Sequence, residues 1–361
     1  MFRSNRPRGP GFTLIEILVV IATVTLITAT LLPALGESRR AARLTGCLAN
    51  LQQFAVATGT YAADYSDLIW AFSWRATGTP NNPRLPSPWP QYQFASNDVV
   101  AGKMQALDIL SRRTGRDPSD FFPIVMLSWI PHVYYMHLVI QDYLGARLPE
   151  KMVACPEDRY RLDWQIDPAN NFDQNVWFPL QEDARNPVNR RWPYSASYQT
   201  PAANYDRGQS DNRISQAEGH MYYWVPGWCE LGGRRLTNVE HPSQKIMLHD
   251  GEQRHFTRNR VFFGWTGSRQ PLLYFDGSVR VEVTGLDVYH HPRLNRLMRG
   301  NEGWTPTAPH SPSPTYIDYV PRRWEAPAQG PFGVDTVPGY YRWTREGLAG
   351  IDFGGMEVYP Y

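Results

Sequence analysis

The segment from Phe12 to Leu35 constrains this chain more than any other. It reads FTLIEILVVIATVTLITATLLPAL and holds no charged residue after Glu16. About 20 apolar residues in a helix that rises ~1.5 Å per residue span the ~30 Å hydrocarbon core of a bilayer. The residues before it carry arginines and no acid, and a basic flank stays on the cytoplasmic side. We therefore expect one membrane-spanning helix, with the rest of the 361-residue chain on the far side.

Two residues of this segment are unusual for a plain membrane anchor. Glu16 lies near the cytoplasmic end of the apolar run, where a carboxylate in lipid costs roughly 2.5–3.5 kcal/mol on insertion scales. Gly11 stands just before the run, whereas a secretory signal is cut after its apolar region. A cut after Gly11 would remove only the basic leader and leave the helix attached. The plain alternative is a single-pass anchor with a chance glutamate near the interface.

The arginine-rich leader, Gly11 and the sequence Phe12-Thr-Leu-Ile-Glu16 resemble the N-terminus of type IV prepilins and of the pseudopilins of type II secretion. This resemblance implies cleavage between Gly11 and Phe12 by a prepilin peptidase, with methylation of the new Phe12 amine. It also implies that Glu16 pairs with the N-terminal amine of a neighbouring subunit when helices move from the inner membrane into a filament. The partners implied are therefore the peptidase, other pilin or pseudopilin subunits and membrane lipid.

Apolar residues continue at helical spacing beyond the membrane segment. From Glu37 to Tyr65 they recur every three or four residues, which predicts an amphipathic helix. Pro33 and Gly36 stand at the exit from the apolar run, and a proline inside a helix removes a hydrogen bond and kinks it. We expect one helix from Phe12 to about Tyr65, about 80 Å long from its rise per residue. Its second half should form the spine of a globular head.

The C-terminal half contains strand-like runs bounded by turn residues, which predict an antiparallel sheet. The runs cover residues 194–198, 220–225, 245–249, 260–264, 272–275 and 278–283. Asp276-Gly277 between the last two is a strong hairpin signal. Residues 133–144 look helical, and residues 152–156 look like a short strand. The predicted fold class is α+β and pilin-like, with a large loop-rich head.

The predicted organisation has three parts. Residues 1–11 form a cytoplasmic leader, residues 12–35 form the transmembrane or filament-core helix, and residues 36–361 form the head, which includes the second half of the helix over 36–66. The head would lie in the periplasm and later in a filament or at the cell surface. No composition shift divides the head into independent domains.

A second resemblance covers the head. Its motifs, in order, resemble those of large prepilin-like proteins of planctomycete and verrucomicrobial bacteria. They are CLANLQQ from Cys47, YAADY from Tyr61, the CPED turn from Cys155, KIMLHDG from Lys245 and LYFDGSV from Leu273. Proteins of that group often carry a histidine followed, after nine residues, by Asp-Gly. Here the histidine position is Thr266, so only the turn remains. The resemblance identifies a type of structural part and implies no chemistry.

The sequence lacks the common catalytic and cofactor-binding motifs, which argues against an enzyme. It also predicts no cofactor. No phosphate-binding loop, dinucleotide fingerprint, zinc-protease motif or nucleophile elbow is present. Net charge is +2, which gives no case for nucleic acid as a partner. Asn171, Asp173, Asn175 and Glu182 approach the ligand spacing of a calcium loop, but Val176 stands where a glycine is needed. A solvated polar loop is the other interpretation of this segment.

Three cysteines, Cys47, Cys155 and Cys229, are too few for a disulfide scaffold. If a disulfide forms in an oxidising compartment, Cys155 and Cys229 are the expected pair, because Cys47 falls within the helix. The competing interpretation is three unpaired, buried thiols.

The sequence favours a structural role for the whole chain. We expect a minor subunit of a type II secretion pseudopilus or a type IV pilus-like filament, because the head far exceeds a minimal pilin. The alternative is a surface adhesin or glycan-binding protein exported by the same route. It rests on the aromatic content of 13%, which includes 13 Trp and 20 Tyr, because aromatic faces can stack on sugars.

Overall fold

A computed structural model describes most of the chain between Gly11 and Phe353. The described residues are 11–78, 85–124, 133–145, 147–174, 193–207, 214–216, 223–256, 261–285, 316–319, 321, 327–328, 335–338, 341–342 and 347–353. All of the predicted leader except Gly11 lies outside them.

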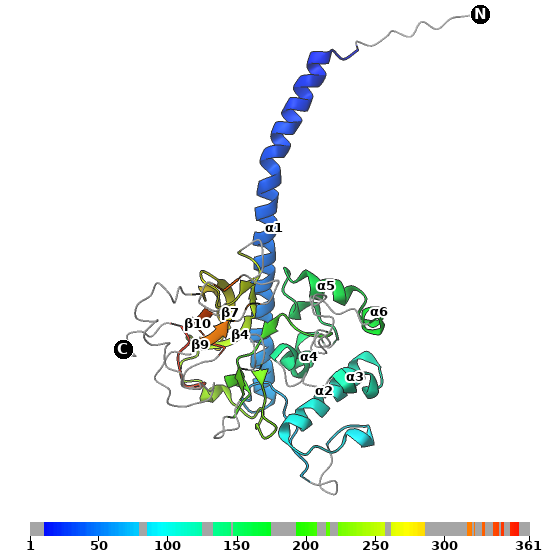
Figure 1. Cartoon of the computed structure of the whole chain (residues 1–361), viewed down its shortest axis with the longest axis vertical. Coiled ribbons are helices and arrows are strands. Elements are labelled where there is room, and N and C mark those ends of the chain that lie inside the picture. The colour runs from blue at the N-terminus through cyan, green and yellow to red at the C-terminus, as the bar shows by residue number, and fades with distance from the viewer. Residues whose placement is uncertain are drawn as a thin grey trace, which may run out of the picture.

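One helix dominates the molecule. Helix α1 runs from Leu14 to Asp64 and passes through Pro33 and Gly36 without a break. Its N-terminal half projects alone from the head, as Figure 1 shows, and every side chain from Gly11 to residue 42 is exposed. Among the described residues, α1 is the one helix long and apolar enough to cross a membrane. The predicted continuous helix is therefore confirmed to within two residues at each end.

Four threonines in the projecting half bond back to their own helix. Their hydroxyl groups donate to backbone carbonyls three or four residues earlier; the threonines are Thr23, Thr25, Thr28 and Thr30. A hydroxyl satisfied within the helix adds little cost in lipid, where water cannot supply a partner. The exposed surface of this half therefore consists of apolar side chains and methyl groups.

The second half of α1 is the centre of the head. Its buried residues repeat at helical spacing and are Cys47, Leu51, Phe54, Ala57, Thr58, Tyr61 and Ala62. They form one face, which packs against the elements β7 (Arg269–Tyr274), β8 (Val279–Val283), η3 (Val133–Ile140) and α4 (Gln141–Leu144). Burying a large apolar side chain contributes about 1.5–3 kcal/mol, so this face holds the helix firmly in the core. In Figure 1 the helices α2 (Asp98–Thr114), α3 (Pro118–Ile124), α5 (Arg159–Ile166) and α6 (Pro168–Asp173) lie on one side of α1. The strands labelled β4 (Ile246–Asp250), β7, β9 (Tyr316–Tyr319) and β10 (Asp335–Pro338) lie on the other.

The main sheet is antiparallel and has the strand order β1-β4-β7-β8. Its strands are β1 (Tyr198–Gln199), β4 (Ile246–Asp250), β7 (Arg269–Tyr274) and β8 (Val279–Val283). The predicted hairpin joins β7 to β8. Gly277 adopts a φ of 82°, and the Asp276 carboxylate accepts a hydrogen bond from Ser278 N at 2.9 Å. Together with the helices, this sheet confirms the α+β class.

Shorter elements surround this core. The helices are η1 (Pro90–Tyr92), α2 (Asp98–Thr114), α3 (Pro118–Ile124), η3 (Val133–Ile140), α4 (Gln141–Leu144), η4 (Lys151–Val153), α5 (Arg159–Ile166), α6 (Pro168–Asp173), η7 (Ala202–Asn204) and η8 (Leu236–Asn238). The strand pairs are β2 (Ser215–Gln216) with β3 (Tyr223–Trp224), β5 (Glu252–Gln253) with β6 (Val261–Phe262), and β9 (Tyr316–Tyr319) with β10 (Asp335–Pro338).

Two predicted elements differ from the structure. Residues 152–156 do not form a strand, because the chain there makes the 3₁₀ turn η4 and a second turn in which Asp158 N donates to the carbonyl of Cys155 at 2.8 Å. Cys155 N donates to Ser197 Oγ instead of to a strand partner, and the proline that follows has no N–H. The helix predicted over 133–144 is the 3₁₀ segment η3 followed by α4, which ends at Gly145 as expected.

Candidate functional site

The predicted processing residues lie at the free end of the projecting helix. Gly11 and Phe12 precede the first helical turn, and Phe12 is 82% exposed. Thr13 is the N-cap residue, with an extended backbone at φ −80° and ψ 153°. An extended, exposed backbone is the form of chain that a peptidase can bind. The geometry is therefore compatible with a cut before Phe12.

Glu16 closes the N-terminus of α1 in a capping box. Its Oε2 accepts hydrogen bonds from Thr13 N and from Thr13 Oγ1, both at 2.7 Å, and Glu16 N donates to Thr13 Oγ1 at 3.3 Å. The box satisfies helix N–H groups that have no partner within the helix, and a carboxylate there also suits the helix dipole. The carboxylate is thus held at the end where cleavage would create the Phe12 amine.

Several motif segments of the head converge where α1 enters it. From the helix, Arg43 Nη1 donates to both carboxylate oxygens of Glu157 at 3.0 Å, and Asn50 Nδ2 donates to the carbonyl of Ala154 at 3.3 Å. Strand β4 ends at Asp250, which is joined to the same turn through a shared arginine. The motif segments that begin at residues 47, 155 and 245 therefore meet at one place. We call it the stem–head junction, where the stem is the exposed part of α1 up to residue 42.

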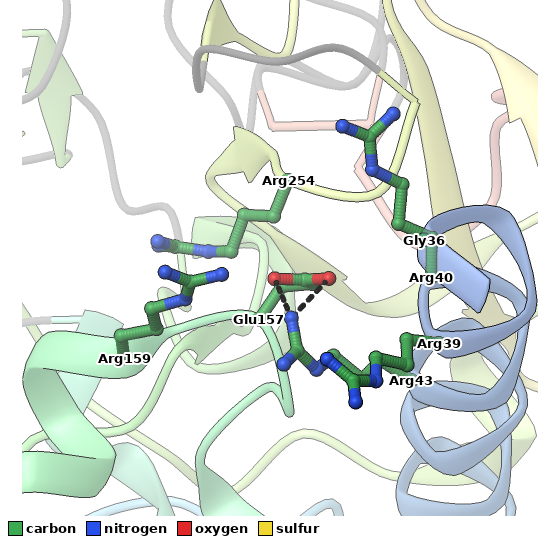
Figure 2. Close-up of a pocket in the computed structure, with 7 residues that line it drawn as sticks. All are labelled: Gly36, Arg39, Arg40, Arg43, Glu157, Arg159 and Arg254. Carbon is green, nitrogen blue, oxygen red and sulfur yellow. Dashed lines mark hydrogen bonds and ion pairs between the residues drawn. The ribbon is translucent and has the colours of Figure 1, made fainter. Parts of the chain in front are cut away.

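Figure 2 shows an arginine-rich pocket of about 280 Å³ at this junction. Its lining residues are Gly36, Arg39, Arg40, Arg43, Glu157, Arg159 and Arg254. Arg43 pairs with Glu157, whereas the structure gives no ion-pair partner among the described residues to Arg39, Arg40 or Arg159. Guanidinium groups bind carboxylates and phosphates through paired hydrogen bonds. The pocket is chemically suited to an anionic group.

A buried ion-pair network lies behind the pocket and centres on Arg254. Its guanidinium contacts Asp158 at 3.3 Å, Asp250 at 2.9 Å and Glu252 at 3.0 Å, and Arg161 also pairs with Asp158. Burial opposes the ionisation of Asp158, but the two arginines outweigh it and lower its pKa. For Asp250 burial prevails and raises the pKa. The network joins the turn before α5 to the end of β4.

Next to this network lies a cluster formed by Cys47 of α1, Cys155 and His255. Their ligand atoms all lie within 4.8 Å of one another, and His255 Nε2 is 3.1 Å from Cys155 Sγ. Both cysteines are fully buried, and His255 is 7% exposed. Burial, together with the neighbouring Cys47, raises the pKa of the Cys155 thiol. The donor set of two thiols and one imidazole is the kind that binds soft and borderline metal ions.

The predicted disulfide between Cys155 and Cys229 is not present. All three cysteines are free and buried. The Cys229 thiol lies against the Asp206 carboxylate at 3.5 Å, whereas Cys155 faces His255 and Cys47. The prediction excluded Cys47 because it is helical, but its side chain lies on the buried face of α1 and reaches the turn at Cys155.

The suggested calcium ligands do not form a loop in the described part of the chain. Asn171 and Asp173 lie in α6, and the Asp173 carboxylate pairs with Arg116 at 2.7 Å. Asn175 and Glu182 lie outside the described residues. The solvated-loop interpretation is also wrong for the first two residues, because Asp167 caps a short helix there.

Most described tryptophans pack in the head. Trp70 and Trp164 are buried, and Trp74, Trp89 and Trp265 are partly buried against the core. Trp228, in contrast, is 73% exposed. One exposed ring does not make the stacking surface that a sugar polymer requires, so the described residues give the glycan-binding alternative no specific support.

Two interior histidines should make the protein sensitive to acid. Burial lowers the pKa of His137 and of His249 to about 3. An unfolded histidine titrates near ~6.5, so the unfolded chain binds more protons than the native chain between these values. The free energy of unfolding should therefore fall as the pH falls from about 6.5 towards 3. Chemical unfolding at a series of pH values measures this slope.

The variant His249→Phe tests the source of that acid sensitivity. The His249 ring centroid lies 4.6 Å from that of Tyr341 and 5.8 Å from that of Phe263, both in tilted contacts, so an aromatic ring suits the site sterically. The variant should show a shallower loss of stability on acidification than the parent chain. An unchanged slope would assign the sensitivity to other groups. His241, a histidine that is only half-buried, supplies the matched control His241→Phe.

The sequence analysis singled out Gly11, Phe12 and Glu16, whose roles stay predictions, but it did not predict the stem–head junction. The five motifs of the head pointed towards the junction, since three of them contribute residues to it. His255 belongs to no motif, and its role depends on a contact with Cys155 across 100 residues of sequence.

The fold defines an α+β protein in which one long helix, apolar and exposed over its first half, carries a head built on an antiparallel sheet. No protein-family model, curated protein or solved structure matches this chain.

Proposed function

We propose that this protein is a pilin-like structural subunit that assembles into a type II secretion pseudopilus or a type IV pilus-like filament. The observation that carries the proposal is helix α1 itself. Its first half is apolar and exposed while its second half is the spine of the head, so the first half needs an apolar environment. A bilayer supplies one before assembly, and the packed helices of neighbouring subunits supply one afterwards.

The N-terminal sequence supports the same mechanism. A prepilin peptidase cuts between Gly11 and Phe12, and the new amine of one subunit pairs with Glu16 of another. The capping box supports this role because it holds the carboxylate at the tip of the helix. Pairing in an apolar environment offsets the cost of a charge that lipid tolerates poorly.

The arginine pocket supports a membrane-inserted stage. Arg39, Arg40 and Arg43 follow directly after the apolar run, so they would lie at the level of the phospholipid headgroups on the head side. Long basic side chains extend to that interface and anchor the end of a spanning helix. The large head suits a minor subunit, which need not pack as densely as the bulk polymer.

Processing by a prepilin peptidase is the direct test. The full chain is expressed with and without the peptidase, and intact-mass and N-terminal peptide spectrometry identify its first residue. We expect a chain that begins at methylated Phe12 only when the peptidase is present. Gly11→Leu should remain uncut, because its side chain obstructs the scissile bond, while Gly36→Leu serves as a glycine control further along the helix. An intact N-terminus in the presence of an active peptidase contradicts the proposal.

A further inference from the structure

The cluster of Cys47, Cys155 and His255 has no part in the proposed assembly mechanism. The three residues come from the middle of α1, from the turn before α5 and from the segment after β5. They meet in the interior, where neither cysteine is exposed to solvent. Two thiols and an imidazole with their ligand atoms within 4.8 Å of one another form a more specific arrangement than apolar packing requires.

The geometry is close to that of a metal centre. Three atoms no more than 4.8 Å apart can all lie within about 2.8 Å of a common point, and zinc bonds to sulfur and nitrogen measure ~2.0–2.3 Å. Small side-chain rotations close that difference. Thiolate and imidazole ligands select zinc over calcium and magnesium, which take oxygen ligands. We propose that Cys47, Cys155 and His255 bind one Zn²⁺ ion, with a water molecule as the fourth ligand.

Charge balance favours this ion at a buried site. A Zn²⁺ ion with two thiolates and a neutral imidazole carries no net charge, so the cost of burying a charge largely disappears. Binding replaces the two thiol protons, which leave to solvent, and no electron transfer is involved.

Neighbouring residues hold the ligands in place. Tyr198 Oη donates a hydrogen bond to Cys47 Sγ at 3.3 Å, and Asn50 Nδ2 lies 3.4 Å from the same phenol oxygen. Ser197 Oγ accepts from Cys155 N at 2.9 Å and donates to Asp158 at 2.7 Å. Residues that orient ligands in this way sharpen both the affinity and the geometry of metal sites.

The site would fasten α1 to two other segments of the head. Its ligands lie far apart in sequence, so the ion would join the helix to the turn before α5 and to the segment after β5. The inference does not depend on the proposed function, because neither processing nor filament assembly enters it.

Cobalt binding to the full chain tests the site. The detergent-solubilised protein is stripped with a chelator, kept reduced with a phosphine and titrated with Co²⁺. We expect one Co²⁺ per chain, a thiolate-to-cobalt charge-transfer band, the visible bands of tetrahedral Co²⁺ and their loss when Zn²⁺ is added. The absence of these bands in fully reduced, folded protein overturns the proposal, whatever the N-terminal processing test shows.

Three variants locate the bound ion. Cys155→Ser and His255→Gln should weaken Co²⁺ binding by more than ~100-fold, since even residues behind metal ligands are worth ~10–100-fold. Cys229→Ser removes a buried thiol outside the cluster and should bind Co²⁺ like the parent chain. Equal loss in Cys229→Ser overturns the assignment. Circular dichroism checks the fold of each variant. If a variant is unfolded, the Co²⁺ titration of the parent chain alone decides for or against the site.

Analysis of the protein as purified separates the metal from a disulfide. We expect about one zinc per chain and alkylatable Cys47 and Cys155 after denaturation. A non-reduced peptide that joins Cys47 to Cys155, in protein that carries no zinc, would overturn the proposal in favour of a disulfide at the same position.

Discussion

Glu16→Ala is expected to leave the chain in the membrane but to remove it from filaments. The substitution deletes a charge from the apolar helix, so insertion should be unaffected or improved. If the Phe12 amine of a neighbour is then left without its partner in an apolar environment, the loss is about 3–5 kcal/mol. That corresponds to a fall in incorporation on the order of 100-fold or more. Membrane fractionation and the quantity of protein in sheared filaments measure the two effects.

A second substitution separates charge pairing from helix capping. Glu16 also closes the capping box with Thr13, and Glu16→Gln retains a hydrogen-bonding side chain at that position while it removes the charge. If charge pairing is the role, Glu16→Gln should assemble as poorly as Glu16→Ala, and Thr13→Ala should assemble well. Glu37→Ala, an exposed acid further along α1, is the matched control. Normal incorporation of Glu16→Ala would contradict the pairing mechanism.

Arg254→Met is expected to destabilise the head by about 3–5 kcal/mol. The change removes the cation that Asp158, Asp250 and Glu252 share and leaves these three carboxylates in the interior, although Arg161 still pairs with Asp158. A buried carboxylate without a cation has lost its hydration and gains no ion pair in exchange, which destabilises the folded state. Denaturant unfolding of the solubilised chain, followed by tryptophan fluorescence, measures the difference.

Arg159→Met is the control for this prediction. Arg159 lines the same pocket as Arg254 but has no ion-pair partner among the described residues, so its loss should change the free energy of unfolding by no more than about 0.5 kcal/mol. Equal destabilisation by the two variants would show that general loss of packing, and not the ion network, is responsible.

Acid should weaken the same network. The arginines hold the pKa of Asp158 below its ordinary value in the folded protein despite burial. Its contribution is therefore complete above the unfolded pKa of ~3.9 and is lost as the pH falls through the lower folded value. This loss follows that of the interior histidines, which begins nearer pH ~6.5.

Residue spacing and turn residues predicted the helix and the hairpin, because neighbouring residues in sequence determine these elements. The apolar spacing through Tyr61 predicted the continuous helix. Asp276-Gly277 predicted the hairpin, because the turn needs a residue with a positive φ and Gly277 adopts 82°. In contrast, helix α2 is the largest element missed. Asn97 caps it and Gly115 ends it with a left-handed φ of 72°, and both residue types are typical of helix ends.

The junction could not be predicted because its contacts are tertiary. Cys47 was excluded as a partner for Cys155 by its helical position, although a buried helix face can carry any side chain to a distant turn. The segment at residues 152–156 has strand composition, yet Cys155 N bonds to Ser197 and the chain turns. Sequence spacing contains no information on which buried side chains such a turn will meet.

The continuity of α1 has a mechanical consequence. A helix that forms both the projecting stem and the spine of the head has no hinge between them, so a pull along its axis reaches the main sheet directly. The seven buried side chains from Cys47 to Ala62 would resist that pull in shear, all at once. Shear across many contacts is harder to break than the opening of a few in sequence. Such a subunit would transmit an axial force through its head before it unfolds, and the stem could not be extracted from the head without dismantling the core.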